Sequence, residues 1–172
     1  MKKIRPAFLL ALCLAASAVA AADQFTADKP SPLKLAPPAR GEETVVRFSG
    51  TVRIAGRFLA GWEGFDRKPR HLRVTFWPDA TTARLLPHAA GAVKELVLTN
   101  NEQAVTMLLD PEAARKLLAK TLLSAEGDAT VTIGDYQAVV ECDHRWYTAR
   151  LVSVTASRDI AVAAGESQRS GC

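Results

Sequence analysis

Residues 131–154 read VTIGDYQAVVECDHRWYTARLVSV, and this stretch decides the expected fold. Apolar and polar residues alternate on both sides of a short polar turn at residues 143–145, which predicts two antiparallel β-strands. In the first strand the apolar residues occupy odd positions up to Ile133 and even positions from Tyr136 onward. The change falls at Gly134-Asp135 and is typical of a β-bulge or a barrel corner. We therefore expect the chain to end on the closing hairpin of a small β-barrel. The inward faces should hold Tyr136, Ala138, Val140, Cys142, Tyr147, Ala149 and Leu151.

Two earlier segments show the same period of two. Residues 46–54 predict a long strand, and Gly50 on its buried face leaves room for a bend or for a closely crossing strand. Residues 72–77 predict a second strand, which Pro78 ends. Between them, residues 56–69 contain several glycines and aromatic residues, which favours a long loop. The side chains expected inside are Val46, Phe48, Val52, Ile54, Leu72, Val74 and Phe76.

The middle of the chain predicts an extra hairpin followed by one helix. Residues 93–98 and 104–109 are expected as extended pieces, joined by a turn at residues 100–102. Asp110-Pro111-Glu112 is a helix start, because Asp caps free amides and Pro fits the first helical position. Apolar residues then recur at helical spacing, so we expect an amphipathic helix that ends near Gly127.

Several strands, one helix and a two-stranded finish resemble the oligonucleotide/oligosaccharide-binding (OB) fold over roughly residues 43–156. The likeness is one of architecture, and small exported bacterial proteins with OB-like barrels are the proteins that this chain resembles. It implies a mainly β, Greek-key barrel with one amphipathic helix before the last strands. The extra hairpin around Asn100-Asn101 and the long loop after Gly56 depart from that pattern.

The start of the chain has the pattern of a secretory signal peptide. Basic residues at positions 2–5 precede a short apolar run at residues 7–16 and the small-residue sequence Ala18-Val19-Ala20. We expect cleavage after Ala20 or Ala22, a periplasmic or secreted location, and no membrane span. A lipid-modified Cys13 is the alternative, although Leu12 stands where a small residue is preferred. Residues 23–42 are expected as a Pro-rich disordered leader, and residues 157–172 as a polar tail.

Removal of residues 1–22 also changes the charge and the cysteine count. It takes away three of the 22 Lys+Arg and none of the 18 Asp+Glu, so the net charge falls from +4 to +1. A nearly neutral protein has no overall field for collecting nucleic acid. Cys142 and Cys172 would then be the cysteines left in an oxidising compartment, which predicts a disulfide worth roughly 3 to 4 kcal/mol. The alternative is a buried Cys142 and a free Cys172.

No arrangement of residues predicts catalysis. Asp143-His144 beside Glu141 is the densest polar cluster, but adjacent strand residues point to opposite faces and converge poorly on a metal ion. No serine lies in a nucleophile motif and no carboxylate pair stands out. We therefore expect no metal, cofactor or catalytic residue.

A binding surface has more support. By parity, the polar face of the first two strands should hold three arginines and a tryptophan, and arginine and aromatic side chains are the groups with which OB-like barrels bind extended ligands. The candidate residues are Arg47, Arg53, Arg73 and Trp77, with Trp62 in the adjoining loop. The sequence thus predicts a non-catalytic binding or accessory module for a protein, peptide or glycan partner in the cell envelope. Two alternatives stay open: an ordinary solvated face, and a small envelope hydrolase or enzyme inhibitor acting through residues 56–69.

Overall fold

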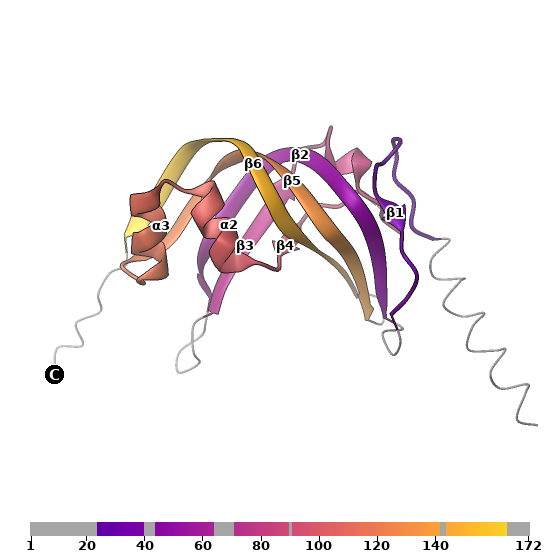
Figure 1. Cartoon of the computed structure of the whole chain (residues 1–172), viewed down its shortest axis with the longest axis horizontal. Helices are drawn as coiled ribbons and strands as arrows, with labels where there is room; N and C mark the ends of the chain where they lie inside the picture. The colour runs from indigo at the N-terminus through magenta and orange to yellow at the C-terminus, as the bar shows by residue number, and fades with distance from the viewer. Residues whose placement is uncertain (1–23, 40–43, 64–70, 90, 142–143, 165–172) are drawn as a thin grey trace, which may run out of the picture.

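A computed structural model describes residues 24–39, 44–63, 71–89, 91–141 and 144–164 (Figure 1). The elements are β1 (Lys34–Leu35), β2 (Val45–Glu63), β3 (His71–Pro78), the 3₁₀ turn η1 (Ala83–Leu85), β4 (Leu96–Leu98), α2 (Asn101–Leu108), α3 (Pro111–Leu118), β5 (Leu122–Glu141) and β6 (His144–Ala164). The protein is therefore mainly β, as expected. Residues 1–22 and both Cys142 and Cys172 lie outside the described residues, so the signal peptide and the disulfide stay predictions.

The strands form a closed ring. Neighbours follow the order β2-β3-β4-β6-β5, and a further pairing of β5 with β2 completes the circle. The β4–β6 pairing is parallel, and the other pairings among the described strands are antiparallel. β1 is added outside the ring, on β2. Figure 1 shows β2, β5 and β6 as long curved strands, with the two helices at one end and β1 at the other.

A corner in the two long strands β2 and β5 lets the sheet curve. The β2–β5 register shifts between Phe48 and Thr51, where Gly50 has φ +97° and Asp135 opposite has φ +49°. The β5–β6 register also shifts between Gly134 and Gln137. Such shifts bend a strand and increase its twist. The corner predicted at Gly134-Asp135 is therefore confirmed.

The predicted hairpin and its inward faces are also confirmed where the structure describes them. Val131 and Ile133 before the corner are buried, as are Tyr136 and Ala138 after it, whereas Val140 is only half-buried. On β6, Ala149 and Leu151 are buried and Tyr147 is half-buried. β6 begins at His144, inside the segment expected as the turn.

The core lies inside this ring and beneath the helices. All seven residues predicted to point inward from the first two strands do so, although Val46 is only half-buried. Phe58, Phe76 and Tyr136 are among the largest fully buried side chains. Burying an apolar side chain of this size contributes roughly 1.5–3 kcal/mol. Gly50 is exposed rather than buried, but the chain does bend there and another segment does cross it.

The extra hairpin predicted around residues 100–102 is wrong. Residues 96–98 form β4, but residues 101–108 form the helix α2. Asn100 and Asn101 do not form a turn: the Asn100 amide accepts from Leu151 N–H and donates to Leu151 C=O, both at 2.9 Å. The Asn101 Oδ1 accepts from Val74 N–H at 2.8 Å. These side chains replace backbone partners of β6 and β3, so α2 can start where β4 ends.

The helix predicted after Asp110 is confirmed at its start and wrong at its end. The Asp110 carboxylate accepts from the amides of Glu112 and Ala113, both at 2.9 Å. The helix α3 ends at Leu118, well before Gly127, because Lys120 takes a left-handed conformation with φ +61° and β5 begins at Leu122.

Three segments expected to be irregular are ordered. Residues 56–63 are not a loop but the second half of β2, paired with both β3 and β5; residues 64–70 lie outside the described chain. Residues 157–164 are not a tail, because β6 continues to Ala164 along β5. The leader, too, is docked on the barrel from residue 24 to residue 39, a segment that we call the N-terminal strap.

Backbone contacts and one buried side chain hold the N-terminal strap. Thr26 and His88 exchange two backbone hydrogen bonds of 3.1 and 2.9 Å, and β1 pairs with β2. Leu33 is 5% exposed within the core. The strap is thus a structural part of the barrel, and its proline content reflects an extended course rather than disorder.

Candidate binding groove

An open groove runs over the outer wall of the barrel at β4, the shortest strand of the ring. Its volume is about 1040 Å³. Its lining comes from β3, from the segment before β4, and from β4, α2 and the start of β6. The lining residues are His71, Leu72, Arg73, Gly91, Ala92, Lys94, Glu95, Val97, Asn101, Arg145, Trp146, Tyr147 and Thr148.

The short strand β4 explains why a groove forms here. β4 has three residues, whereas β3 has eight and β6 has 21. It pairs with β3 only at residues 96–97 and with β6 only at residues 97–98. Beyond those pairs, β3 and β6 have no strand between them. The irregular segment at residues 91–95 lines the groove there instead. A surface of mixed backbone and side chains results, rather than a flat sheet.

Arg73 is fixed by two carboxylates. Its guanidinium lies 3.4 Å from Glu63 and 3.3 Å from Glu95, and its side chain is 37% exposed. Ion pairs at this exposure contribute little to stability, at about 0–1 kcal/mol each. They do hold the side chain across the mouth of the groove. Among the described residues, no hydrogen-bond acceptor reaches its Nε.

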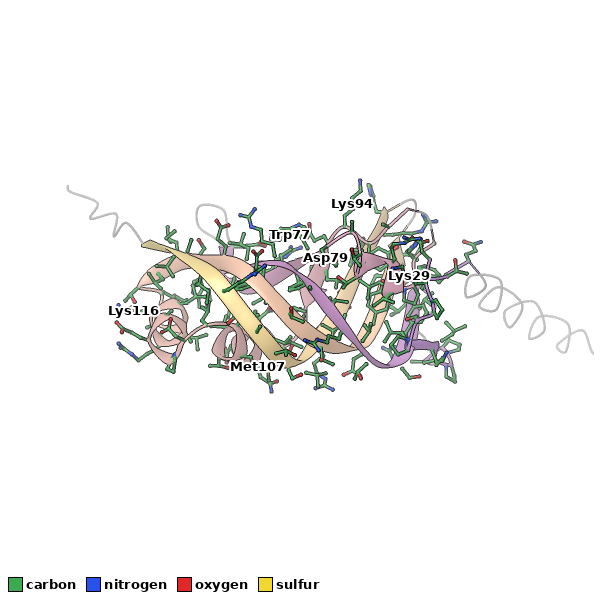
Figure 2. The ribbon with its side chains drawn as sticks, turned by 90° about the horizontal axis from the view of Figure 1, so that it is seen from above. Lys29, Trp77, Asp79, Lys94, Met107 and Lys116 are labelled. Atoms are coloured by element: carbon green, nitrogen blue, oxygen red, sulfur yellow. The ribbon has the colours of Figure 1, made fainter. Side chains whose placement is uncertain are left out.

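Lys94 and Arg145 give one end of the groove its free positive charge. Both residues line the groove, and each lies three positions before a member of the parallel pair Val97–Thr148. Both are exposed, and no carboxylate of the described chain forms an ion pair with either. Figure 2 shows Lys94 on the same long side of the molecule as Trp77 and opposite Met107.

Trp146 adds an apolar surface next to these cations. It is 40% exposed, whereas Trp62 and Trp77 are half-buried. Its neighbour Tyr147 turns into the barrel instead, where its ring stacks on that of Tyr136 at 5.9 Å between centroids. Burial raises the pKa of the Tyr147 phenol, and a hydrogen bond with the Ala89 backbone and the charge of Arg145 partly offset this effect. Tyr147 is therefore uncharged at neutral pH and lies on the barrel side of the groove lining, a position that we call the groove floor.

Aromatic rings connect this floor to the N-terminal strap. Tyr136 also packs on Phe48 at 5.4 Å, and Phe48 packs on Phe25 of the strap at 6.3 Å. The Tyr136 hydroxyl donates a 2.7 Å hydrogen bond to the Pro87 carbonyl. The strap, the segment before β4 and the groove floor thus share one packed row of side chains.

Of the residues expected from the sequence, Arg73 lines this groove and the other four do not. Arg53 is exposed where β2 pairs with Thr132 of β5, and Arg47 is half-buried on the other side of the bend at Gly50. Trp77 is half-buried opposite Arg57. Arg53 lies eight residues along β2 from Gly61, the partner of Arg73. At roughly 3.3 Å per residue this is about 26 Å, so parity puts these residues on the outside of the barrel without bringing them together.

Trp62 has a structural role in the described chain. Its indole N–H donates a 2.7 Å hydrogen bond to the Leu117 carbonyl at the end of α3, and Lys120 Nζ lies 4.4 Å from the centre of its ring. The side chain is half-buried and lines a smaller neighbouring cavity. Trp62 therefore fastens α3 to β2 beside the groove.

The groove residues that sequence reasoning missed are Lys94, Arg145 and Trp146. The sequence places Arg145 in the expected turn, and Trp146 follows it directly. Trp146 alternates with the inward-facing residues Tyr147 and Ala149, so the hairpin pattern does contain a signal for an outward-facing aromatic side chain. Lys94 lies in an irregular segment and had no such signal.

The described residues contain no group of three or more His, Cys, Asp or Glu side chains that could hold a metal ion. In the same part of the chain, no helix has the length and apolar character needed to cross a membrane. Comparison of the sequence with protein-family models and with curated proteins, and of the structure with solved structures, found no match.

Proposed function

We propose that the protein is an exported, OB-like, non-catalytic binding or accessory module of the bacterial cell envelope, and that it takes its partner in the groove. The observation that carries this proposal is the combination of Lys94, Arg145 and Trp146 at one end of the groove. Exposed lysine and arginine side chains are well hydrated by themselves, so it is their position beside an exposed indole within a groove that supports a binding role, because arginine and aromatic side chains are enriched at protein interfaces.

The strand order supports the OB-like part of the proposal. In an OB fold the first strand pairs with the second and fourth, and a helix precedes the fourth. Here β2 pairs with β3 and β5, and the helices α2 and α3 precede β5. The sequence indicated two departures from the OB pattern, an extra hairpin around Asn100-Asn101 and a long loop after Gly56. In the structure, residues 101–108 are helical and residues 56–63 belong to a strand. Binding on the wall of the second and third barrel strands, which are β3 and β4 here, is what such a barrel offers.

Export rests on the basic start, the short apolar run and the small residues before position 21. Mass spectrometry of the protein from its host should find an N-terminus at Ala21 or Asp23. Intact Met1 or a lipid-modified Cys13 would contradict export by this route. The proposed Cys142–Cys172 disulfide should appear in the same experiment as one cross-linked fragment under non-reducing conditions.

The binding proposal is tested by capture from the host's envelope fraction, with the mature protein as bait. The groove variant carries Lys94→Ala and Arg145→Ala, and the matched control carries Arg53→Ala and Arg115→Ala. All four side chains are exposed and the two variants lose the same charge, so both should fold with stability within about 1 kcal/mol of the parent protein.

The groove variant should lose most of the captured partner, and the control should retain it. Equal capture by both variants would show that the groove is an ordinary solvated surface. Loss of capture in the control alone would indicate that the partner binds the face around Arg53 that the sequence predicted.

A further inference from the structure

We infer that the groove takes an acidic peptide segment carrying an apolar side chain; this inference rests on the proposed binding function and specifies its partner. The partner's acidic groups would meet Lys94 and Arg145, and its apolar side chain would pack on Trp146. This assignment follows from the charges, the hydrogen-bonding groups and the apolar surface of the groove.

The groove is locally positive in a protein that is nearly neutral once residues 1–22 are removed. Its lining holds three permanently charged cations, Arg73, Lys94 and Arg145, and one carboxylate, Glu95. Arg73 is already paired with Glu95 at 3.3 Å and with Glu63, outside the lining, at 3.4 Å, so these three side chains carry no surplus positive charge. The remaining charge at the Lys94–Arg145 end is therefore uncompensated within the described chain. A ligand with carboxylates would supply what is missing, and its approach would be steered by the local field.

The hydrogen-bonding groups of the groove favour a peptide over a glycan. A glycan has a hydroxyl on nearly every carbon and needs many side-chain acceptors. Here the Glu95 carboxylate serves Arg73, and the Asn101 Oδ1 accepts from Val74 N–H at 2.8 Å. His71 and the hydroxyls of Tyr147 and Thr148 remain as acceptors for sugar hydroxyls, but no unpaired carboxylate of the described lining does, whereas a ligand's carboxylates need donors, which lysine and arginine provide.

The apolar part of the lining gives the peptide an anchor. Trp146 is 40% exposed, and Val97 and Ala92 lie along the same groove. Aromatic and arginine side chains are the residue types that most often dominate binding energy at protein interfaces. The preferred peptide should therefore combine Asp or Glu with a Leu-like or aromatic side chain.

The first test is selection of random peptides displayed on phage against the immobilised mature protein. We expect a consensus that joins acidic residues to an apolar one. The same library selected against the groove variant, Lys94→Ala with Arg145→Ala, should not yield that consensus. Selection against Arg53→Ala with Arg115→Ala should yield it unchanged. A basic or uncharged consensus, or an acidic consensus that the groove variant also selects, would overturn the inference.

The second test is titration of the selected peptide, fluorescently labelled, by anisotropy. Each exposed charge pair is worth about 0.2–1 kcal/mol, so the groove variant should bind the peptide about two- to thirty-fold more weakly. Replacement of the peptide's acidic residues by Asn and Gln should weaken binding by a similar factor, and added salt should weaken it further. Trp146→Ala should weaken it independently of salt. Binding that is indifferent to salt and to these changes would contradict the charge assignment.

An acidic oligosaccharide, oligogalacturonate, serves as the competitor of another class. It should fail to displace the peptide at concentrations where an unlabelled copy of the peptide succeeds. If oligogalacturonate binds more tightly than any selected peptide, the groove is a glycan site and the inference is wrong, although the proposed binding function stands. If capture from the envelope fraction is insensitive to the groove variant, the proposed function itself fails.

Discussion

At the scale of single residues, Tyr136 is the side chain on which the groove floor depends. It is fully buried, its ring packs against those of Phe48 and Tyr147, and its hydroxyl donates to the Pro87 carbonyl at 2.7 Å. Burial raises the pKa of this phenol well above its ordinary value. The hydroxyl therefore keeps its proton and donates at neutral pH and above the ordinary pKa of tyrosine, near 10.

The substitution Tyr136→Phe keeps the ring and removes the hydroxyl. At neutral pH it should lower the free energy of unfolding by about 1–3 kcal/mol, because the buried Pro87 carbonyl loses its donor. Tyrosine in the unfolded chain loses its proton near pH 10, whereas folded Tyr136 keeps it. The stability of the parent protein should therefore be unaffected by this group below about pH 10 and fall above it, by up to about 1.4 kcal/mol per pH unit.

Urea denaturation of the two proteins between neutral pH and about pH 11 measures this effect, since an unfolded tyrosine titrates near 10. The stability gap between parent and variant should narrow at the alkaline end. Tyr147, whose pKa is also raised, is present in both proteins, so its own titration largely cancels from the difference, and burial is the larger cause of the Tyr136 shift. A gap that stays constant across the range would mean that Tyr136 titrates normally and is not buried as described.

The residue scale also shows what local sequence could and could not predict. The phase change at Gly134-Asp135 is a local feature, and it identified the corner and the inward faces around it. Asn100 and Asn101 have equally local signals for a turn, but their amides bond to the backbones of β6 and β3, which lie far away in sequence. A side chain that substitutes for a backbone partner cannot be identified before the partner strand is placed.

At the scale of elements, the N-terminal strap has the largest consequence. Proline content suggested a disordered leader, yet the strap crosses β2 at Gly50, where the Pro32 carbonyl lies 2.8 Å from the position that a Cβ would occupy. It also holds the segment before β4, through the paired backbones of Thr26 and His88. The strap thus supports both the corner of the barrel and one border of the groove.

The substitution Gly50→Ala should be more destabilising than Gly91→Ala. Both glycines have positive φ, at +97° and +68°, so each alanine is strained. Only at Gly50 would the new Cβ also meet the strap, because Gly91 has open space around it. We expect a loss of about 1 kcal/mol for Gly91→Ala and about 2–4 kcal/mol for Gly50→Ala, measured by urea denaturation. Equal losses would mean that the strap does not cross β2 closely.

Helix ends and strand lengths were the least predictable elements. The helical spacing of apolar residues continued through Thr121 and Leu122, so the sequence favoured a longer helix than α3. Leu122 is indeed buried, but as the first residue of β5, whose neighbouring segment pairs with the end of β2 at Gly61 and Ser124. That pairing joins residues far apart in the chain, and tertiary pairing of this kind overrides local propensity.

At the scale of the whole molecule, the class of fold was predictable and the site was not. Alternating strands, one capped helix and a final hairpin were sufficient to predict a mainly β barrel. The groove, in contrast, joins β3, the segment before β4 and the start of β6, and no pattern in the sequence connects these three. The alternation of residues correctly predicts that Arg53 and Arg73 face outward. It does not predict how the two strands are aligned, and therefore how far apart the two side chains lie.

The central claim is that the groove itself contacts the partner, and photo-crosslinking in the living host tests it most directly. A benzophenone amino acid in place of Thr148, within the groove, is compared with the same group in place of Thr132, which pairs with Arg53 on another part of the barrel. Crosslinked partner should form from position 148 and not from position 132. A crosslink from position 132 alone, or none from position 148 while the partner still copurifies, would contradict the account.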